Sequence, residues 1–150
     1  MWTYGLFGQI GKGAVIRNIT FDKTVYSGGT DVSIGLLAWS VQGATIENIT
    51  INVKAYAKVN SDNNADRIAG LFVEHGIFAA RYFIDNVVRN VKVNAQGFEL
   101  GRVIARVTKG CTFEYCTIYA KSYDYIADDT DSASYNMLEE FPDGLAFIEA

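Results

Sequence analysis

The strongest constraint on the fold is a nine-residue block that occurs twice. Residues 13–21, GAVIRNITF, recur 30 positions later as residues 43–51, GATIENITI, and six of the nine residues are identical. Self-similarity at a fixed period is typical of architectures in which one supersecondary unit stacks on the next. The sequence therefore predicts a stacked repeat.

Two weaker copies, residues 85–93 and 110–118, extend the series to four units. Each copy follows a block of glycine and aliphatic residues, and the leading glycines of these blocks are 30, 35 and 31 residues apart: Gly5, Gly35, Gly70 and Gly101. The units are expected near 4–31, 32–66, 67–98 and 99–121. They form a repeat body over 1–121, and residues 122–150 form a different segment.

Alternation of apolar and polar residues inside each unit indicates short strands, and no unit shows the 3.6-residue period of a helix. The alternation shifts by one residue at Asn18, so the chain must bend there, and asparagine tolerates left-handed backbone. Asn18, Asn48 and Asn90 are therefore predicted to form one corner on successive turns. The expected fold is all-β, a right-handed parallel β-helix of about four rungs. A Greek-key sandwich is the alternative, but it does not explain the 30-residue identity.

Stacked rungs place equivalent residues in columns about 4.8 Å apart. Two inward columns are expected, one of Ala14, Ala44, Asn86 and Cys111 and one of Ile16, Ile46, Val88 and Phe113. The outward position before the corner carries alternating charges, namely Arg17, Glu47, Arg89 and Glu114. Opposite charges on adjacent strands stabilise a sheet, so this column is interpreted as a solvated surface ladder.

The residues GLFGQI at 5–10 and GAVIRNI at 13–19 resemble the GLUG-type repeat of bacterial surface proteins. The second unit is similar, with Leu37 and Ala38 in place of phenylalanine and glycine, and the third matches in part. The fourth matches only over 110–118, where Tyr115 replaces the corner asparagine. The resemblance implies a β-helical piece of a larger exported bacterial protein, beside adhesion, carbohydrate-binding or peptidase modules. An extracellular or cell-surface location is implied by the resemblance alone.

Charge is distributed unevenly along the chain, whose net charge is −4. Residues 1–121 contain all 13 basic residues and 9 acids, whereas 122–150 contain 8 acids and no base. The bases are mostly single residues between apolar ones, which disfavours a nucleic-acid partner. No apolar stretch reaches the roughly 20 residues of a membrane helix, and residues 1–4 do not resemble the start of a signal peptide.

Candidate metal ligands occur in the loop 61–66. Asp62, Asn64 and Asp66 reproduce the first oxygen ligands of a calcium loop, but Arg67 and Val73 occupy the positions of its glycine and its bidentate glutamate. A polar loop between rungs is the favoured interpretation, and no metal or cofactor is predicted. The acidic residues Asp128, Asp129 and Asp131 lie in a connector typical of solvated turns.

No catalytic constellation is recognisable. His75 follows Glu74, but no nucleophile or second acid accompanies them at a recognisable spacing. Cys111 and Cys116 occupy predicted inward positions and are expected to be core thiols. The chain is therefore predicted to be non-enzymatic.

The segment 134–150, which ends in the apolar run GLAFI at 144–148, is expected to be a last rung or a cap. A partner-binding arm is the alternative. The sequence thus favours a rigid spacer or a module that binds a glycan or a surface protein beside neighbouring domains of a longer chain. The alternatives are a fragment of a carbohydrate-active β-helix enzyme and a phage tail-spike segment.

Overall fold

The computed structural model describes residues 2–4, 6–26, 32–34, 37–56, 67–68, 79–105, 107–127 and 138–150. Within these residues the protein contains thirteen strands and no helix, and every strand pair is parallel. The protein is therefore all-β, with parallel sheets arranged as in a β-helix.

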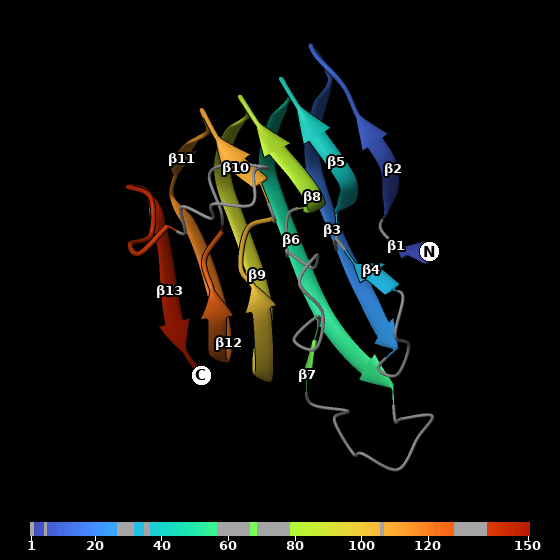
Figure 1. Cartoon of the computed structure of the whole chain (residues 1–150), viewed down its shortest axis with the longest axis vertical. Helices are drawn as coiled ribbons and strands as arrows, with labels where there is room; N and C mark the ends of the chain where they lie inside the picture. Colours follow the sequence, from blue (N-terminus) through green and yellow to red (C-terminus); the bar gives the residue numbers. More distant parts are fainter. Residues whose placement is uncertain are drawn as a thin grey trace.

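The larger sheet contains the long strands in the order β13, β12, β9, β6, β3, that is Leu145–Glu149, Cys116–Tyr125, Val87–Arg102, Thr45–Tyr56 and Val15–Tyr26. Two short strands, β11 (Thr112–Glu114) and β7 (Arg67–Ile68), also pair with β9. The second sheet has the order β10, β8, β5, β2, that is Val107–Lys109, Ala79–Ile84, Ala38–Gln42 and Phe7–Ile10. A separate pair joins β1 (Trp2–Tyr4) to β4 (Val32–Ile34). The strands of the two main sheets form two layers that run in opposite directions (Figure 1).

Each unit changes direction at two left-handed positions. The predicted asparagine corner is confirmed, because φ is 59° at Asn18, 54° at Asn48 and 50° at Asn90. A second corner, which the sequence analysis did not identify, lies where the short strand turns into the long one. Its members are Gly13, Gly43, Asp85 and Gly110, with φ of 80°, 70°, 54° and 67°. Glycine dominates this corner because it adopts positive φ without steric cost.

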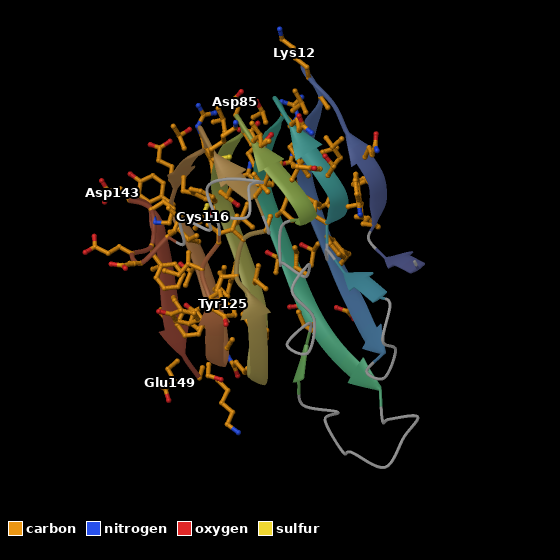
Figure 2. All side chains as sticks on the ribbon, viewed as in Figure 1. Lys12, Asp85, Cys116, Tyr125, Asp143 and Glu149 are labelled. Carbon is orange, nitrogen blue, oxygen red and sulfur yellow. The ribbon has the colours of Figure 1, made fainter. Side chains whose placement is uncertain are left out.

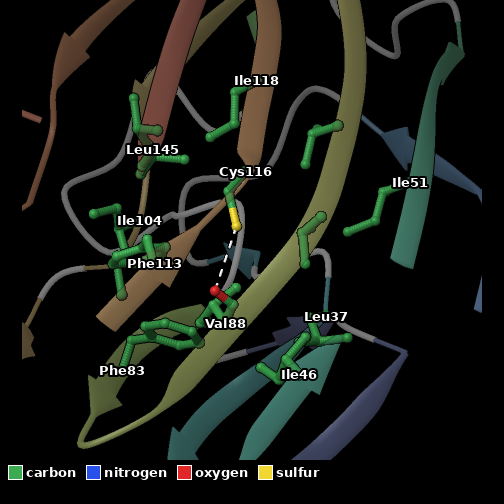
Figure 3. Close-up of a cluster of buried hydrophobic side chains, with 14 of the residues drawn as sticks. Leu37, Ile46, Ile51, Phe83, Val88, Ile104, Phe113, Cys116, Ile118 and Leu145 are labelled. Carbon is green, nitrogen blue, oxygen red and sulfur yellow. Dashed lines mark hydrogen bonds between the residues drawn. The ribbon is translucent and has the colours of Figure 1, made fainter. Parts of the chain in front are cut away.

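The predicted register is confirmed. Ile16 pairs with Ile46, Ile46 with Val88, and Val88 with Phe113. Ile46 and Val88 are fully buried, whereas Ile16, in the first strand of the sheet, is half-buried. Figure 3 shows Ile46, Val88, Phe113 and Ile118 directed into one continuous core between the two layers. Core side chains of the middle rungs are therefore more deeply buried than those of the first rung.

Asn86 ties the third rung to the second at the glycine corner. Its side-chain amide donates to the carbonyl of Val41 at 2.9 Å and accepts from the N–H of Ala44 at 2.9 Å. The Cys111 thiol repeats this arrangement one rung later, donating to the carbonyl of Phe83 at 3.2 Å and accepting from the N–H of Asn86 at 3.4 Å. The buried Asn86 and the partly buried Cys111 thus satisfy backbone groups at the turn.

Candidate functional site

Several predicted site residues lie outside the described residues. They are Asp62, Asn64, Asp66, His75, Asp128, Asp129 and Asp131. Among the residues that are described, no group of three or more His, Cys, Asp or Glu side chains is placed to hold a metal ion. Polar and charged side chains do come together on the outer surface of the larger sheet.

Both cysteines are free, and both bond to the backbone. The Cys116 thiol donates to the carbonyl of Glu114 at 3.4 Å and lies 3.6 Å from that of Val88 (Figure 3). Burial raises the pKa of Cys111 to about 11 and also raises the pKa of Cys116. Because the thiolate is the nucleophilic form, neither side chain has the properties of an activated nucleophile.

The charged column has the predicted register, with Arg17 beside Glu47, Glu47 beside Arg89, and Arg89 beside Glu114. Arg89 contacts both acids, at 3.2 Å from Glu114 and 3.7 Å from Glu47. All three side chains are at least partly exposed, so each pair contributes only about 0.2–1 kcal/mol. The column is a surface ladder that supports the stack.

Two ladders of amide side chains run beside the charged column. At the asparagine corner, Asn90 donates to Asn48 at 2.9 Å and Asn48 donates to Asn18 at 3.0 Å. Four residues further along the strands, Asn94 donates to Asn52 at 2.8 Å and Asn52 to Asp22 at 3.1 Å. The hydrogen bonds hold these exposed polar groups at fixed spacing.

Both ladders end at tyrosines of the fourth rung. Tyr115 occupies the corner position after Asn90, and Tyr119 pairs with Asn94. Between them, Thr117 pairs with Lys92, whose Nζ lies 5.3 Å from the centre of the Tyr119 ring. We call Tyr115, Thr117, Tyr119, Lys92 and Asn94 the tyrosine face.

Tyr115 is the most exposed large hydrophobic residue in the described part of the chain, with 82% of its surface accessible. Its backbone has φ of 55°, so a bulky side chain stands where the three preceding rungs have asparagine. On its other side the last rung has Gly144, and a Cβ there would collide with the carbonyl oxygen of Phe113. No side chain therefore covers Tyr115 from the last rung.

The tyrosine face combines two kinds of binding group. The two tyrosines are four residues apart along the chain, which corresponds to about 13 Å between their Cα atoms in an extended strand. An ammonium group and an amide lie beside the second ring. Aromatic rings stack on the apolar faces of sugars, and amide, hydroxyl and ammonium groups hydrogen-bond to hydroxyls. The sequence signal for this site was Tyr115 at a corner otherwise occupied by asparagine.

The comparisons with known proteins give no relative. The chain matches no family model, no curated protein and no solved structure. In the described residues, no helix has the length and apolar character needed to cross a membrane.

Proposed function

We propose that the chain is a non-enzymatic module of a bacterial surface or secreted protein that binds a glycan through the tyrosine face. We further propose that the fold is a right-handed parallel β-helix of about four rungs, which holds the tyrosine face rigidly. The surface location and the neighbouring domains of a longer chain rest on the resemblance of residues 5–51 to GLUG-type repeats.

The observation that carries the proposal is the exposed tyrosine in left-handed backbone. For residues other than glycine and asparagine this conformation costs about 1–2 kcal/mol. Three equivalent corners use asparagine, so Tyr115 accepts a cost that the repeat avoids elsewhere. Backbone strain of this kind concentrates at ligand-binding sites, and the Tyr119 ring beside Lys92 supplies a second contact on the same strand.

The test is a glycan array probed with the full chain, followed by titration of any glycan it retains. Tyr115→Asn preserves the corner and Tyr119→Ala leaves it untouched, and each should weaken binding at least about fivefold because aromatic contacts dominate such interfaces. Tyr125→Ala is the matched control, since Tyr125 is 44% exposed but lies outside the tyrosine face.

Other outcomes identify the competing functions. Release of new reducing ends with turnover would overturn the proposal in favour of a carbohydrate-active enzyme. Absence of any glycan binding would favour a rigid spacer or a protein-binding module. A stable trimer in solution, together with silence on the array, would favour a phage tail-spike segment.

A further inference from the structure

Lys92 is the only charged residue of the tyrosine face, and its neighbours on the outer surface of the larger sheet are uncharged. It pairs with Thr50 on one side and with Thr117 on the other. The next outward residues along its own strand are Asn90 and Asn94, whose amides donate to the preceding rung. Side chains that pair across strands of a sheet interact directly. Lys92 therefore has no acid among these neighbours.

The acids of the charged column do not compensate Lys92. Glu47 and Glu114 precede the corner on their rungs, whereas Lys92 follows it. Arg89 engages both of these acids, at 3.7 Å from Glu47 and 3.2 Å from Glu114. Within the described residues, Lys92 itself forms no ion pair. Its positive charge is therefore left for a group that these residues do not supply.

The Lys92 side chain is directed toward the tyrosines. Its backbone pairs with Thr117, but its Nζ lies 5.3 Å from the ring centre of Tyr119, two residues further along β12. The exposed side chain thus reaches from β9 across to β12. A cation held against an aromatic ring is attracted by the electrons of the ring. The contact places the ammonium group beside a ring that is available for contact with a sugar.

The protein as a whole does not supply a positive field at this surface. Its net charge is −4, and residues 122–150 contain 8 acids and no base. Long-range electrostatics therefore do not attract an anion to the chain. Attraction of an anion to the tyrosine face must come from Lys92 at contact distance, through charge-assisted hydrogen bonds from its ammonium group. A single substitution can therefore isolate it.

We propose that the glycan bound by the tyrosine face is anionic, and that Lys92 binds its negative group while Tyr115 and Tyr119 contact the sugar rings. This inference rests on the proposed function and adds the chemical class of the ligand. A sugar carboxylate and a sulfate ester both present negatively charged oxygens, and an ammonium group can donate to either. The hydroxyl of Thr117, which lies between the two tyrosines along β12, can donate to the same group.

The test begins with a glycan array that contains neutral, carboxylated and sulfated glycans, probed with the full chain. Each retained glycan is then titrated beside two counterparts of the same length and linkage, so that every set has a neutral, a carboxylated and a sulfated member. We expect an anionic member to bind at least about threefold more tightly than the neutral one, because charge-assisted hydrogen bonds are stronger than neutral ones. Added salt should reduce this preference, because Lys92 is exposed. The tighter of the two anionic members identifies the source of the negative group.

Three variants separate Lys92 from the net charge of the chain. Lys92→Gln should abolish the preference for the anionic member while binding of the neutral member remains, and Lys92→Arg should retain the preference. Lys12→Gln is the matched control with the same change in net charge. Lys12 is exposed in the loop between β2 and β3, at one extreme of the molecule (Figure 2). A purely structural role of Lys92 would change the thermal unfolding of the Lys92→Gln chain but not its preference.

The outcomes distinguish this inference from the proposed function. Equal affinity of the unmodified chain for neutral and anionic members would overturn the inference and leave glycan binding intact. Retention of no glycan would overturn both. A preference that Lys12→Gln reduces as much as Lys92→Gln does would assign the effect to net charge and overturn the role of Lys92. If Lys92→Gln fails to fold, the salt dependence of the unmodified chain decides, and a preference that salt does not reduce overturns the inference.

Discussion

Positive φ at residues other than glycine marks the positions where side-chain identity matters most for the turns. In the described part of the chain these are Asn18, Asn48, Asp85, Asn90 and Tyr115. Asparagine and aspartate stabilise left-handed backbone by local hydrogen bonding, and the corner asparagines also bond to one another between rungs. Tyr115 has neither advantage.

We therefore expect Tyr115→Asn to increase the free energy of unfolding by about 0.5–1 kcal/mol, because it relieves the left-handed strain. The new amide would also follow Asn90 in the ladder. Urea unfolding monitored by circular dichroism measures the effect. Tyr119→Asn is the matched control. Tyr119 lies within a regular strand, so this substitution relieves no strain and should not increase the free energy of unfolding. Equal or lower stability of the Tyr115→Asn chain would contradict the strain argument.

Ionisation of the Cys111 thiol should make the free energy of unfolding depend on pH. Burial raises its pKa from 9.0 to about 11, so the folded state favours the neutral thiol. Stabilisation by this thiol is complete below about pH 9 and is lost as the pH rises through about 11. The free energy of unfolding of the unmodified chain should therefore fall more steeply between these values than that of Cys111→Ala. A difference between the two chains that does not change with pH would contradict this expectation.

The position of a strand in the stack decides how much each of its core side chains contributes to the free energy of unfolding. Ile46 is fully buried between neighbouring strands on both sides, and Ile16 is half-buried on the edge strand β3. Ile46→Ala should lower the free energy of unfolding by about 2–5 kcal/mol because it leaves an internal cavity. Ile16→Ala should lower it by less. Thr50→Ala, on the outer face, should cost less than about 1 kcal/mol. Equal losses in urea unfolding would contradict the assigned orientation of the strands.

The register of these strands was predictable because the first two units repeat the same residues around Asn18 and Asn48. Aliphatic side chains recur in the buried column that contains Ile46 and Val88, since each must pack on its neighbour. The link between Asn86 and Cys111 was not predictable, because two chemically different side chains fill equivalent roles. The tyrosine face was also missed, since outward positions carry no packing constraint that makes them repeat.

At the scale of the whole molecule, the two ends of the stack differ. At the C-terminal end, Tyr123 packs edge-on against Phe141 and Phe147, with ring centres 5.1 and 4.8 Å away. Phe141 also stacks on Phe147 at 5.8 Å. At the N-terminal end, Val15 and Leu6 are 54% and 43% exposed. The segment 138–150 thus covers apolar side chains of the fourth rung.

Deleting residues 134–150 should therefore lower the unfolding midpoint in a way that added salt does not change. The deletion removes β13 and both phenylalanines, so it exposes the β12 edge and the apolar side chains of Cys116 and Ile118, which are now 2% and 0% exposed. Loss of apolar burial is not screened by ions, unlike loss of an ion pair. Any self-association of the truncated chain through its new apolar edge should likewise be insensitive to salt. Thermal unfolding and sedimentation at low and high salt measure both effects. A truncated chain with an unchanged midpoint that stays monomeric would instead identify the segment as a partner-binding arm.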